Sequence, residues 1–565
     1  MPSRSTQHRT LLLVALVAAL PYANALRGTF LYDDIKNVVR NPHIRTLGNL
    51  PLFFTSNVAA DDTRDSYRPF RATSFALDYA VWGLNPLGFH LTNVLLHAAN
   101  PCLAFSLVRK LLGSSAAGFL AALLFATHPA QTESVTWVNS RGDVLFAFFF
   151  LVSCLLFLWS DASRRPLQTS RQRWLYASSV AGYGFSLLAK EMAAPLPFIL
   201  GLHVLCFGAS GVAARFDRAA KLAVPYLGMA ALYALARWAV CGQISHAADL
   251  HDRHIGLSNA LLMLCEMLGR YGVSILLPVH LGIAHLVQSA NIVSTRLHVL
   301  GALFALIALA TAAWALRRNR TLFFALGWFF IALLPVSNIL PIKILFAERF
   351  LYVPLLAWPL GLAALLVEHH TRRLGIVALL LLLVGCASAL TAERNHVWRT
   401  SETLWYDAAR KSPGNPVVHH SLGHQYRDRG HTVRAARSFE RALSASPDDW
   451  VVLHSLALAY GQLGHTDRAV SMLKQVIALN PDFGLAHLNL GQFRLRAGQV
   501  DEALRELELA SKLEPNMHEA FFSLGRAYER QGRREDALRA YRQSLVLEPV
   551  ANPALNALER LVRTP

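Results

Sequence analysis

Apolar and polar positions divide the chain into two parts with different periodicities. Up to about residue 391, apolar runs near the length needed to cross a membrane follow one another, separated by short polar segments. The apolar run 261–278 is interrupted by charged residues, so the pattern leaves its crossing open. We expect eleven membrane helices, in the runs 11–26, 88–112, 115–127, 144–159, 174–189, 192–208, 221–241, 298–316, 321–336, 350–367 and 374–391.

The rest of the chain repeats with a period of 34 residues. Proline, glycine and alanine each recur at this spacing, at Pro413, Pro447, Pro481, Pro515 and Pro549, at Gly430, Gly464, Gly498 and Gly532, and at Ala435, Ala469, Ala503 and Ala537. This period, with segments such as "SLGHQY" (421–426), is the signature of tetratricopeptide (TPR) repeats. We expect Gly and Ala to let the two helices of a repeat approach closely, and Pro to end each repeat.

The predicted fold class is therefore all-α: a polytopic transmembrane helix bundle followed by a TPR α-solenoid. We expect a membrane domain at 1–391, a linker helix at 392–412, four TPR repeats at 413–548 and a capping helix at 549–565. A TPR groove commonly binds a peptide or a partner protein. The alternative is that the repeats only stabilise or oligomerise the membrane part.

Composition supports the membrane prediction and gives an orientation. Charged residues make up 16% of the chain, against about 25% in soluble proteins. The net charge of +18 does not indicate nucleic-acid binding, because basic residues cluster in short loops such as 164–173 and 317–320. This placement follows the positive-inside rule. We expect an integral protein of a bacterial inner membrane, with the N-terminus cytoplasmic and the TPR domain periplasmic.

On this topology, polar residues gather on the outer face. They come from four separate stretches of the chain and include Asp33 and Asp34, then His128, Glu133, Arg141 and Asp143, then Lys190 and Glu191, and finally Asn338, Glu348 and Arg349. Each stretch also has a structural explanation: adjacent aspartates often form a solvated turn, and Lys190-Glu191 or Glu348-Arg349 would serve as ion pairs. Their convergence favours an active site.

Such a set suits transfer of a sugar from a polyprenyl-phosphate carrier. The reaction needs a carboxylate to accept the proton of the acceptor hydroxyl, for which Asp33 or Asp34 is the candidate. It also needs cations for the phosphate, for which Arg141, Lys190 and Arg349 are candidates. The supporting polar residues are His128, Glu133, Asp143, Glu191 and Glu348. Beyond the donor, the sequence indicates no certain cofactor. A divalent metal stays open: its candidate ligands belong to a histidine-rich loop with His246, His251, Asp252 and His254, and the alternative is that this loop is solvated.

Several segments resemble the transmembrane and TPR repeat-containing O-mannosyltransferase family and its prokaryotic relatives, which have the C-type glycosyltransferase fold. The matching segments are "YDD" (32–34), the block 67–97, "HPAQTESVTWVNSRGDVL" (128–145), "KE" (190–191) and the block 335–354, with "WRTSETLW" (398–405) leading into the repeats. The resemblance implies transfer of mannose from a lipid-phosphate carrier to Ser or Thr hydroxyls of proteins, with an acidic catalytic residue in the first external loop. It also implies that the TPR domain lies on the same face as the active site. We expect the TPR domain to receive the acceptor protein.

Two rival interpretations remain. An enzyme of the same fold would glycosylate a glycolipid or an envelope glycan, and would use the repeats to recruit partners. A non-enzymatic membrane scaffold would display the TPR module and would tolerate loss of Asp33 and Asp34. A transporter is disfavoured, because the charges gather at one face and not at mid-membrane.

Overall fold

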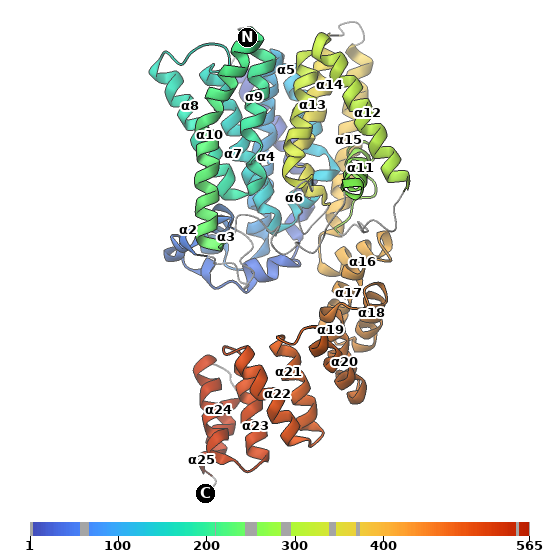
Figure 1. The fold of residues 1–565 in the computed structure, drawn as a ribbon. Helices are drawn as coiled ribbons and strands as arrows, with labels where there is room; N and C mark the ends of the chain where they lie inside the picture. Colours follow the sequence, from blue (N-terminus) through green and yellow to red (C-terminus); the bar gives the residue numbers. More distant parts are fainter. Residues whose placement is uncertain are drawn as a thin grey trace. The chain divides into compact units, whose positions relative to one another are not determined.

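The computed structural model describes residues 4–56, 67–209, 211–242, 257–283, 295–337, 346–368, 373–549 and 553–563. The chain divides into two compact units, Met1–Asp407 and Ala408–Pro565. Within the described residues the regular elements are helices, which confirms the predicted all-α class. Figure 1 shows the many helices of the first unit and the helix pairs of the second.

The long helices of the first unit coincide with the predicted apolar runs. They are α1 (Arg4–Ala19), α3 (Pro69–Trp82), α4 (Pro86–Leu112), α5 (Ser115–Thr127), α7 (Arg141–Ser160), α8 (Ser170–Ala189), α9 (Leu196–Phe207), α10 (Val212–Cys241), α11 (Leu257–Leu276), α12 (Thr295–Arg318), α13 (Arg320–Leu333), α14 (Ala357–Glu368), α15 (Arg373–Val397) and α16 (Ser401–Lys411), of which α3, α11 and α16 are additional to those runs. Because α16 ends at Lys411, it continues past the last residue of the first unit.

Short helices occupy the turns between the long ones. They are η1 (Leu20–Arg27), η2 (Ile35–Val39), η3 (His43–Arg45), η4 (Leu47–Asn49), α2 (Leu52–Thr55), η5 (Pro129–Gln131), α6 (Thr132–Thr136), η6 (Val138–Ser140), η7 (Glu191–Ala193), η9 (Leu334–Val336), η10 (Glu348–Leu351) and η11 (Pro354–Leu356). These turns carry the residues that the sequence singled out.

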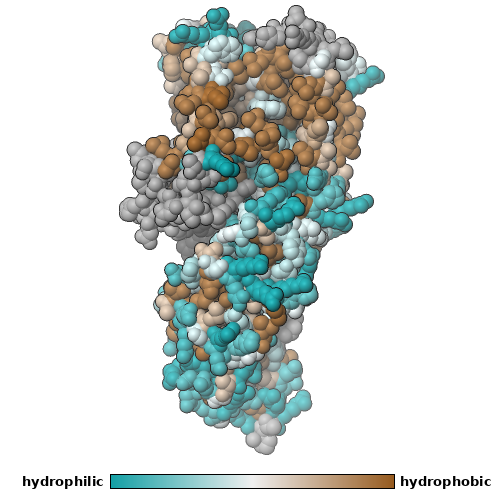
Figure 2. Space-filling view, turned by 90° about the vertical axis from the view of Figure 1, so that its right-hand side faces the viewer, coloured by the Kyte–Doolittle hydropathy of each residue, from teal (hydrophilic) through white to brown (hydrophobic). Residues whose placement is uncertain are grey.

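Six helical segments among the described residues are long and apolar enough to cross a membrane, and these make the chain an integral membrane protein. They are Ser5–Arg27, Pro86–Leu112, Val138–Ser160, Val212–Cys241, Arg296–Arg318 and Ala378–Val397, and the shorter apolar helices are Ser115–Thr127, Glu191–Phe207, Arg320–Val336 and Pro354–Leu366. Leucines such as Leu306, Leu309 and Leu382 are more than half exposed on this unit, and Figure 2 shows hydrophobic residues gathered over its surface. Lipid is the environment that such a surface requires.

The bundle packs around α7. This helix lies against α4 and α8, while α9 packs on α10 and α13, and α14 packs on α5 and α13. Trp328 of α13 is buried in this core, where its indole donates a hydrogen bond to the backbone oxygen of Val353 (3.1 Å). The amphipathic helix α11 packs mainly on α12 and also contacts η10.

The second unit consists of successive helix pairs. The pairs are α17 (Pro416–Asp428) with α18 (Thr432–Ala445), α19 (Trp450–Gln462) with α20 (Thr466–Leu479), α21 (Gly484–Arg496) with α22 (Val500–Leu513) and α23 (His518–Arg530) with α24 (Arg534–Leu547), followed by α25 (Ala554–Arg563). The repeated alanines at 435, 469, 503 and 537 are fully buried. Their small side chains fit where the two helices of a pair meet.

The repeated glycines serve a different purpose from the predicted one. Gly430, Gly464, Gly498 and Gly532 have φ values between +77° and +83°, and a Cβ at these positions would meet nothing within 4 Å. They are therefore required by the left-handed turn between the helices of a pair, not by close packing. Close packing depends on another glycine of the repeat: a Cβ at Gly491 would lie 2.7 Å from Cγ of Leu507.

We predict that Leu507→Ala lowers the free energy of unfolding of the repeat unit by about 2–5 kcal/mol, because the side chain is fully buried between repeats. The matched control is Leu509→Ala on the same helix, where the side chain is 40% exposed, and its cost should stay within about 0.5 kcal/mol. Urea denaturation followed by circular dichroism measures both. Equal losses for the two variants would contradict the packing described.

Candidate functional site

Buried ion pairs bring the four predicted stretches together. Glu133, before α7, pairs with Arg349 of η10. Asp143, in the first turn of α7, accepts a hydrogen bond from Nζ of Lys190 (2.6 Å), at the end of α8. Asp33 and Asp34 contact Asn139 from the first loop. Residues from the four stretches that the sequence placed on one face therefore meet in one part of the first unit.

Asp34 is fully buried and holds two backbone segments together. Its Oδ2 accepts a hydrogen bond from the backbone N–H of Leu31 (2.8 Å), and its Oδ1 accepts one from the backbone N–H of Asn139 (2.7 Å). Burial raises the pKa of Asp34 to about 8, against the effect of these two hydrogen bonds. Both carboxyl oxygens are thus occupied by the backbone.

Asp33 is half-buried and faces cations instead. Its Oδ2 accepts a hydrogen bond from the side-chain amide of Asn139 (3.4 Å). Burial raises the pKa of the Asp33 carboxyl, and the positive charges of Arg71, Arg349 and Lys36 oppose that rise. Of the two aspartates, Asp33 is the one with a carboxylate open to a ligand.

The backbone just before these aspartates has an uncommon conformation. Tyr32 has a φ of +47°, which few residues other than glycine adopt. Its ring is 47% exposed and lies edge-on to Trp405 of α16, with ring centroids 5.5 Å apart. Backbone strain of this kind is often found at functional sites.

Arg349 is clamped between an acid and two aromatic rings. Its backbone N–H donates a hydrogen bond to Oε2 of Glu133 (3.0 Å), and its guanidinium pairs with the other oxygen of the same carboxylate. The guanidinium also lies 5.5 Å from the ring centroid of Trp137 and 5.2 Å from that of Phe350. Neighbouring Glu348 accepts a hydrogen bond from the backbone N–H of Gly282 (2.9 Å), which ties η10 to the segment after α11.

Two of the predicted residues lie in other surroundings. Arg141 is fully buried, and its guanidinium donates to the carboxylate of Asp78 (2.7 Å), the backbone oxygen of Phe89 (2.7 Å) and the side chain of Asn93. The ring of His128 accepts a hydrogen bond from the backbone N–H of Ala130 at Nδ1 (3.2 Å), so its Nε2 donates to the backbone oxygen of Ile275 (3.0 Å). The structure thus gives both side chains a full set of protein partners.

The structure adds three residues that the sequence interpretation did not select. Arg68 forms a bidentate ion pair with Glu191, whose pKa is held below its usual range by that guanidinium in spite of burial. Asn139 contacts both aspartates and also accepts a hydrogen bond from Nη1 of Arg71 (3.3 Å). These side chains lie inside the segments used for the resemblance, and the signal was the pair of arginines in "YRPFR" (67–71).

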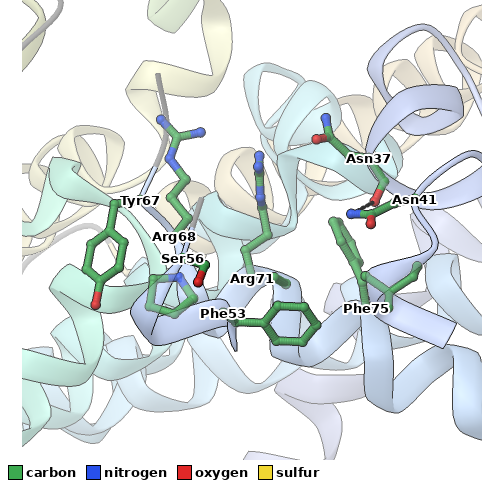
Figure 3. A pocket seen from close by; sticks show the side chains of 11 residues that line it. Asn37, Asn41, Phe53, Ser56, Tyr67, Arg68, Arg71 and Phe75 are labelled. Carbon is green, nitrogen blue, oxygen red and sulfur yellow. Dashed lines mark hydrogen bonds between the residues drawn. The ribbon is translucent and has the colours of Figure 1, made fainter. Parts of the chain in front are cut away.

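A hollow lies beside this network. Its volume is about 40 Å³, and it is lined by residues of the first loop and α3, among them Asn37, Ser56, Tyr67, Arg68 and Arg71. Figure 3 shows the guanidinium groups of Arg68 and Arg71 projecting in the same direction from neighbouring turns of the chain. The hollow is therefore bordered by two cations.

The structure neither supports nor tests the predicted metal. Within the described residues, no group of three or more His, Cys, Asp and Glu side chains is arranged to hold a metal ion. His246, His251, Asp252, His254 and Asn338 lie outside the described residues.

Comparison with known proteins gives relatives for both units. Sequence families described as tetratricopeptide repeat match residues 462–524 and 518–549. "Protein O-mannosyl-transferase TMTC4" of Mus musculus is 27% identical over 497 residues, which cover 76% of this chain and 65% of the relative. "Protein O-mannosyl-transferase TMTC2" of Homo sapiens is 36% identical over 177 residues, covering 30% of this chain and 21% of the relative. The solved structure of MamA covers 26% of this chain and 87% of its own, with 24% identity and a TM-score of 0.25.

The match to the TMTC4 proteins crosses most of the chain, whereas the chain spans 65% of the length of these relatives from mouse and human. The TPR matches fall in the helix pairs of the second unit. Over most of its length the chain is thus similar to proteins named O-mannosyl-transferase, and its C-terminal unit contains TPR repeats.

Proposed function

We propose that the chain is a glycosyltransferase that moves mannose from a polyprenyl-phosphate carrier to Ser or Thr hydroxyls of proteins on the outer face of the membrane. The observation that carries this proposal is a half-buried carboxylate, Asp33, next to cations in a homologue of proteins named O-mannosyltransferases. A carboxylate and nearby cations are the two groups that the reaction requires.

In the proposed reaction, Asp33 takes the proton of the acceptor hydroxyl. The hydroxyl oxygen forms a bond to the anomeric carbon, and the bond from that carbon to the phosphate oxygen breaks with its electron pair. The polyprenyl phosphate leaves as an anion, and the configuration at the anomeric carbon inverts. The raised pKa of Asp33 favours this role, because a base works best when its pKa lies near the working pH.

Asp34 acts in this proposal as a positioning residue. Its two hydrogen bonds to the backbone of Leu31 and Asn139 fix the first loop against the turn before α7. Asn139 in turn donates to Asp33. The contact orients the base, and Asp34 itself needs no contact with substrate.

An apolar groove among α11, α12, α13 and α14 suits the lipid chain of the donor. Its volume is about 270 Å³, and apolar side chains such as Phe304, Ala308, Phe329 and Trp358 line it. Ile275 borders the groove and also accepts the hydrogen bond from His128. Because α11 also contacts η10, which carries Arg349, the groove lies on elements that reach the polar cluster.

The repeat unit has a surface suited to an extended peptide. Val417, Val451 and Leu485 occupy the same position in three successive repeats and are 40–53% exposed. Beside them, the rings of His420 and His454 contact Ser455 and Asn489 of the following repeats (3.0 Å each). TPR repeats commonly bind peptides, and we propose that this surface receives the acceptor protein.

We predict that Asp33→Asn lowers mannosyl transfer to a Ser/Thr-rich peptide by about 10²- to 10⁴-fold, because the base is lost. The fold should persist, since the carboxylate makes one weak hydrogen bond. The control is Asp217→Asn, an exposed carboxylate on α10, which should keep full activity. In the unmodified protein the rate should rise with pH as Asp33 loses its proton. Full activity of Asp33→Asn would exclude Asp33 as the base.

We predict that Asp34→Asn destabilises the protein by about 1–3 kcal/mol, because an amide nitrogen would then face a backbone N–H. The pH dependence has a definite sign. A pKa of about 8, raised from 3.8, means that the folded protein binds the proton more tightly than the unfolded one, so the contribution of Asp34 to stability falls between these values as pH rises. Thermal unfolding in detergent from pH 5 to pH 8 should lose this slope in the variant; an unchanged slope would contradict the assignment.

We predict that Ala308→Phe, which fills the apolar groove, raises the KM for a long-chain polyprenyl-phosphate mannose and leaves the KM for a short-chain analogue unchanged. Ala310→Phe on the exposed side of the same helix is the matched control. Steady-state transfer with both donors measures the difference. The same KM change for both donors would mean that the groove does not hold the lipid chain.

A further inference from the structure

Arg71 differs from the cations around it, because its buried guanidinium forms no direct ion pair among the described residues, although Asp33, Asp143 and Glu191 are near enough to act on its charge. Its neighbours are each paired: Arg68 with Glu191, Lys190 with Asp143, and Arg349 with Glu133. Arg71 is 9% exposed, and the side-chain hydrogen bond that it makes in the described part of the chain is the one to Asn139 Oδ1 (3.3 Å). Its pKa is lowered to about 10 by burial and by the charge of Arg68, against the opposing effect of three nearby carboxylates, so it stays charged at neutral pH.

A buried charge that no direct ion pair neutralises is costly. A neutral residue in place of Arg71 would remove this free-energy cost. A direct ion pair with a carboxylate would offset it, as in the neighbouring pairs. A third solution is an anionic ligand that supplies the missing charge when it binds. The position of Arg71 at the edge of the hollow in Figure 3 fits this third solution.

Three further features around Arg71 suit an anion. A Cβ at Gly142 would lie 3.8 Å from Cδ of Arg71 and 3.6 Å from Cδ of Lys190, so both side chains flank the first turn of α7. The N-terminus of a helix attracts negative charge. The hydroxyl of Ser140, at the start of α7, is buried and has no hydrogen-bond partner among the described residues.

We propose that Arg71 binds the phosphate of the glycosyl donor, in the hollow lined by the first loop and α3. This inference rests on the proposed function and places the phosphate at a residue other than Arg141 and Arg349, whose guanidinium groups already have partners. The guanidinium offers two parallel N–H groups to phosphate oxygens.

The same residue links phosphate binding to the base. Arg71 donates to Asn139, and Asn139 donates to Asp33. As the bond between sugar and phosphate breaks, charge grows on the phosphate oxygen next to Arg71, and the guanidinium stabilises it. Arg71 therefore binds the leaving group while it holds, through Asn139, the carboxylate that receives the acceptor's proton.

The test is the thermal shift of the full chain in detergent on adding polyprenyl phosphate, because a ligand that binds the folded state raises Tm. Arg71→Met should weaken binding on the order of 10- to 100-fold, and Arg71→Lys should keep part of the affinity, since it retains charge but loses the paired N–H groups. The control is Arg40→Met, at an exposed arginine of the first loop, and this variant should bind as the unmodified protein does.

Titration with inorganic phosphate shows whether the site takes the lipid-linked phosphate of the donor or free phosphate. Competition by inorganic phosphate with polyprenyl phosphate, lost in Arg71→Met, is the expected result. A shift with inorganic phosphate alone, and none with polyprenyl phosphate, would overturn the assignment to the donor. An unchanged shift in Arg71→Met would also overturn it. If Arg71→Met does not fold, equal affinity of Arg71→Lys and the unmodified protein for polyprenyl phosphate would overturn the assignment.

The binding assay is independent of catalysis. Loss of binding in Arg71→Met, together with absence of transfer from any mannosyl donor, would support the phosphate site and reject the proposed function. Normal binding in Arg71→Met, together with loss of transfer in Asp33→Asn, would reject the phosphate site and keep the proposed function.

Discussion

Pairing of buried charge is the constraint on which this site depends. Each charge taken out of water costs free energy that only a well-placed partner offsets. Here the partners come from different turns: Glu133 meets Arg349, and Asp143 meets Lys190, across 216 and 47 residues of sequence. The same ion pairs therefore neutralise these charges and hold the turns of the bundle together. Removal of either partner would leave an unpaired charge in the interior.

Within this frame, the paired charges and the unpaired ones have different uses. The pairs fix the turns, and the two backbone hydrogen bonds of Asp34 fix the first loop against them. Asp33 and Arg71 remain as a carboxylate and a guanidinium whose direct contacts are to Asn139. Rigid surroundings, with one carboxylate and one guanidinium that form no direct ion pair among the described residues, are expected of a site that binds a charged substrate.

The sequence predicted the membrane helices and the repeats from their periodic patterns, and the polar cluster from its high density of charged residues. Apolar runs revealed the membrane helices, and the period of 34 revealed the repeats, because each depends on residues close together in the chain. The role of Arg141 was not predictable, since its partner Asp78 lies on another helix, 63 residues away. The sequence alone does not single out Arg71, because the side chain of an arginine in an amphipathic helix is usually solvated. Its burial depends on packing against Asn139 and Gly142, which lie far away in the chain.

The most direct measurement is a cryo-electron microscopy structure of the full chain with a mannosyl donor analogue whose phosphate is replaced by a non-cleavable phosphonate. Our proposal predicts the phosphonate within hydrogen-bond distance of Arg71 and the anomeric carbon facing Asp33. It also predicts the lipid chain in the groove among α11, α12, α13 and α14. A phosphonate bound elsewhere, or a sugar placed away from Asp33, would contradict it.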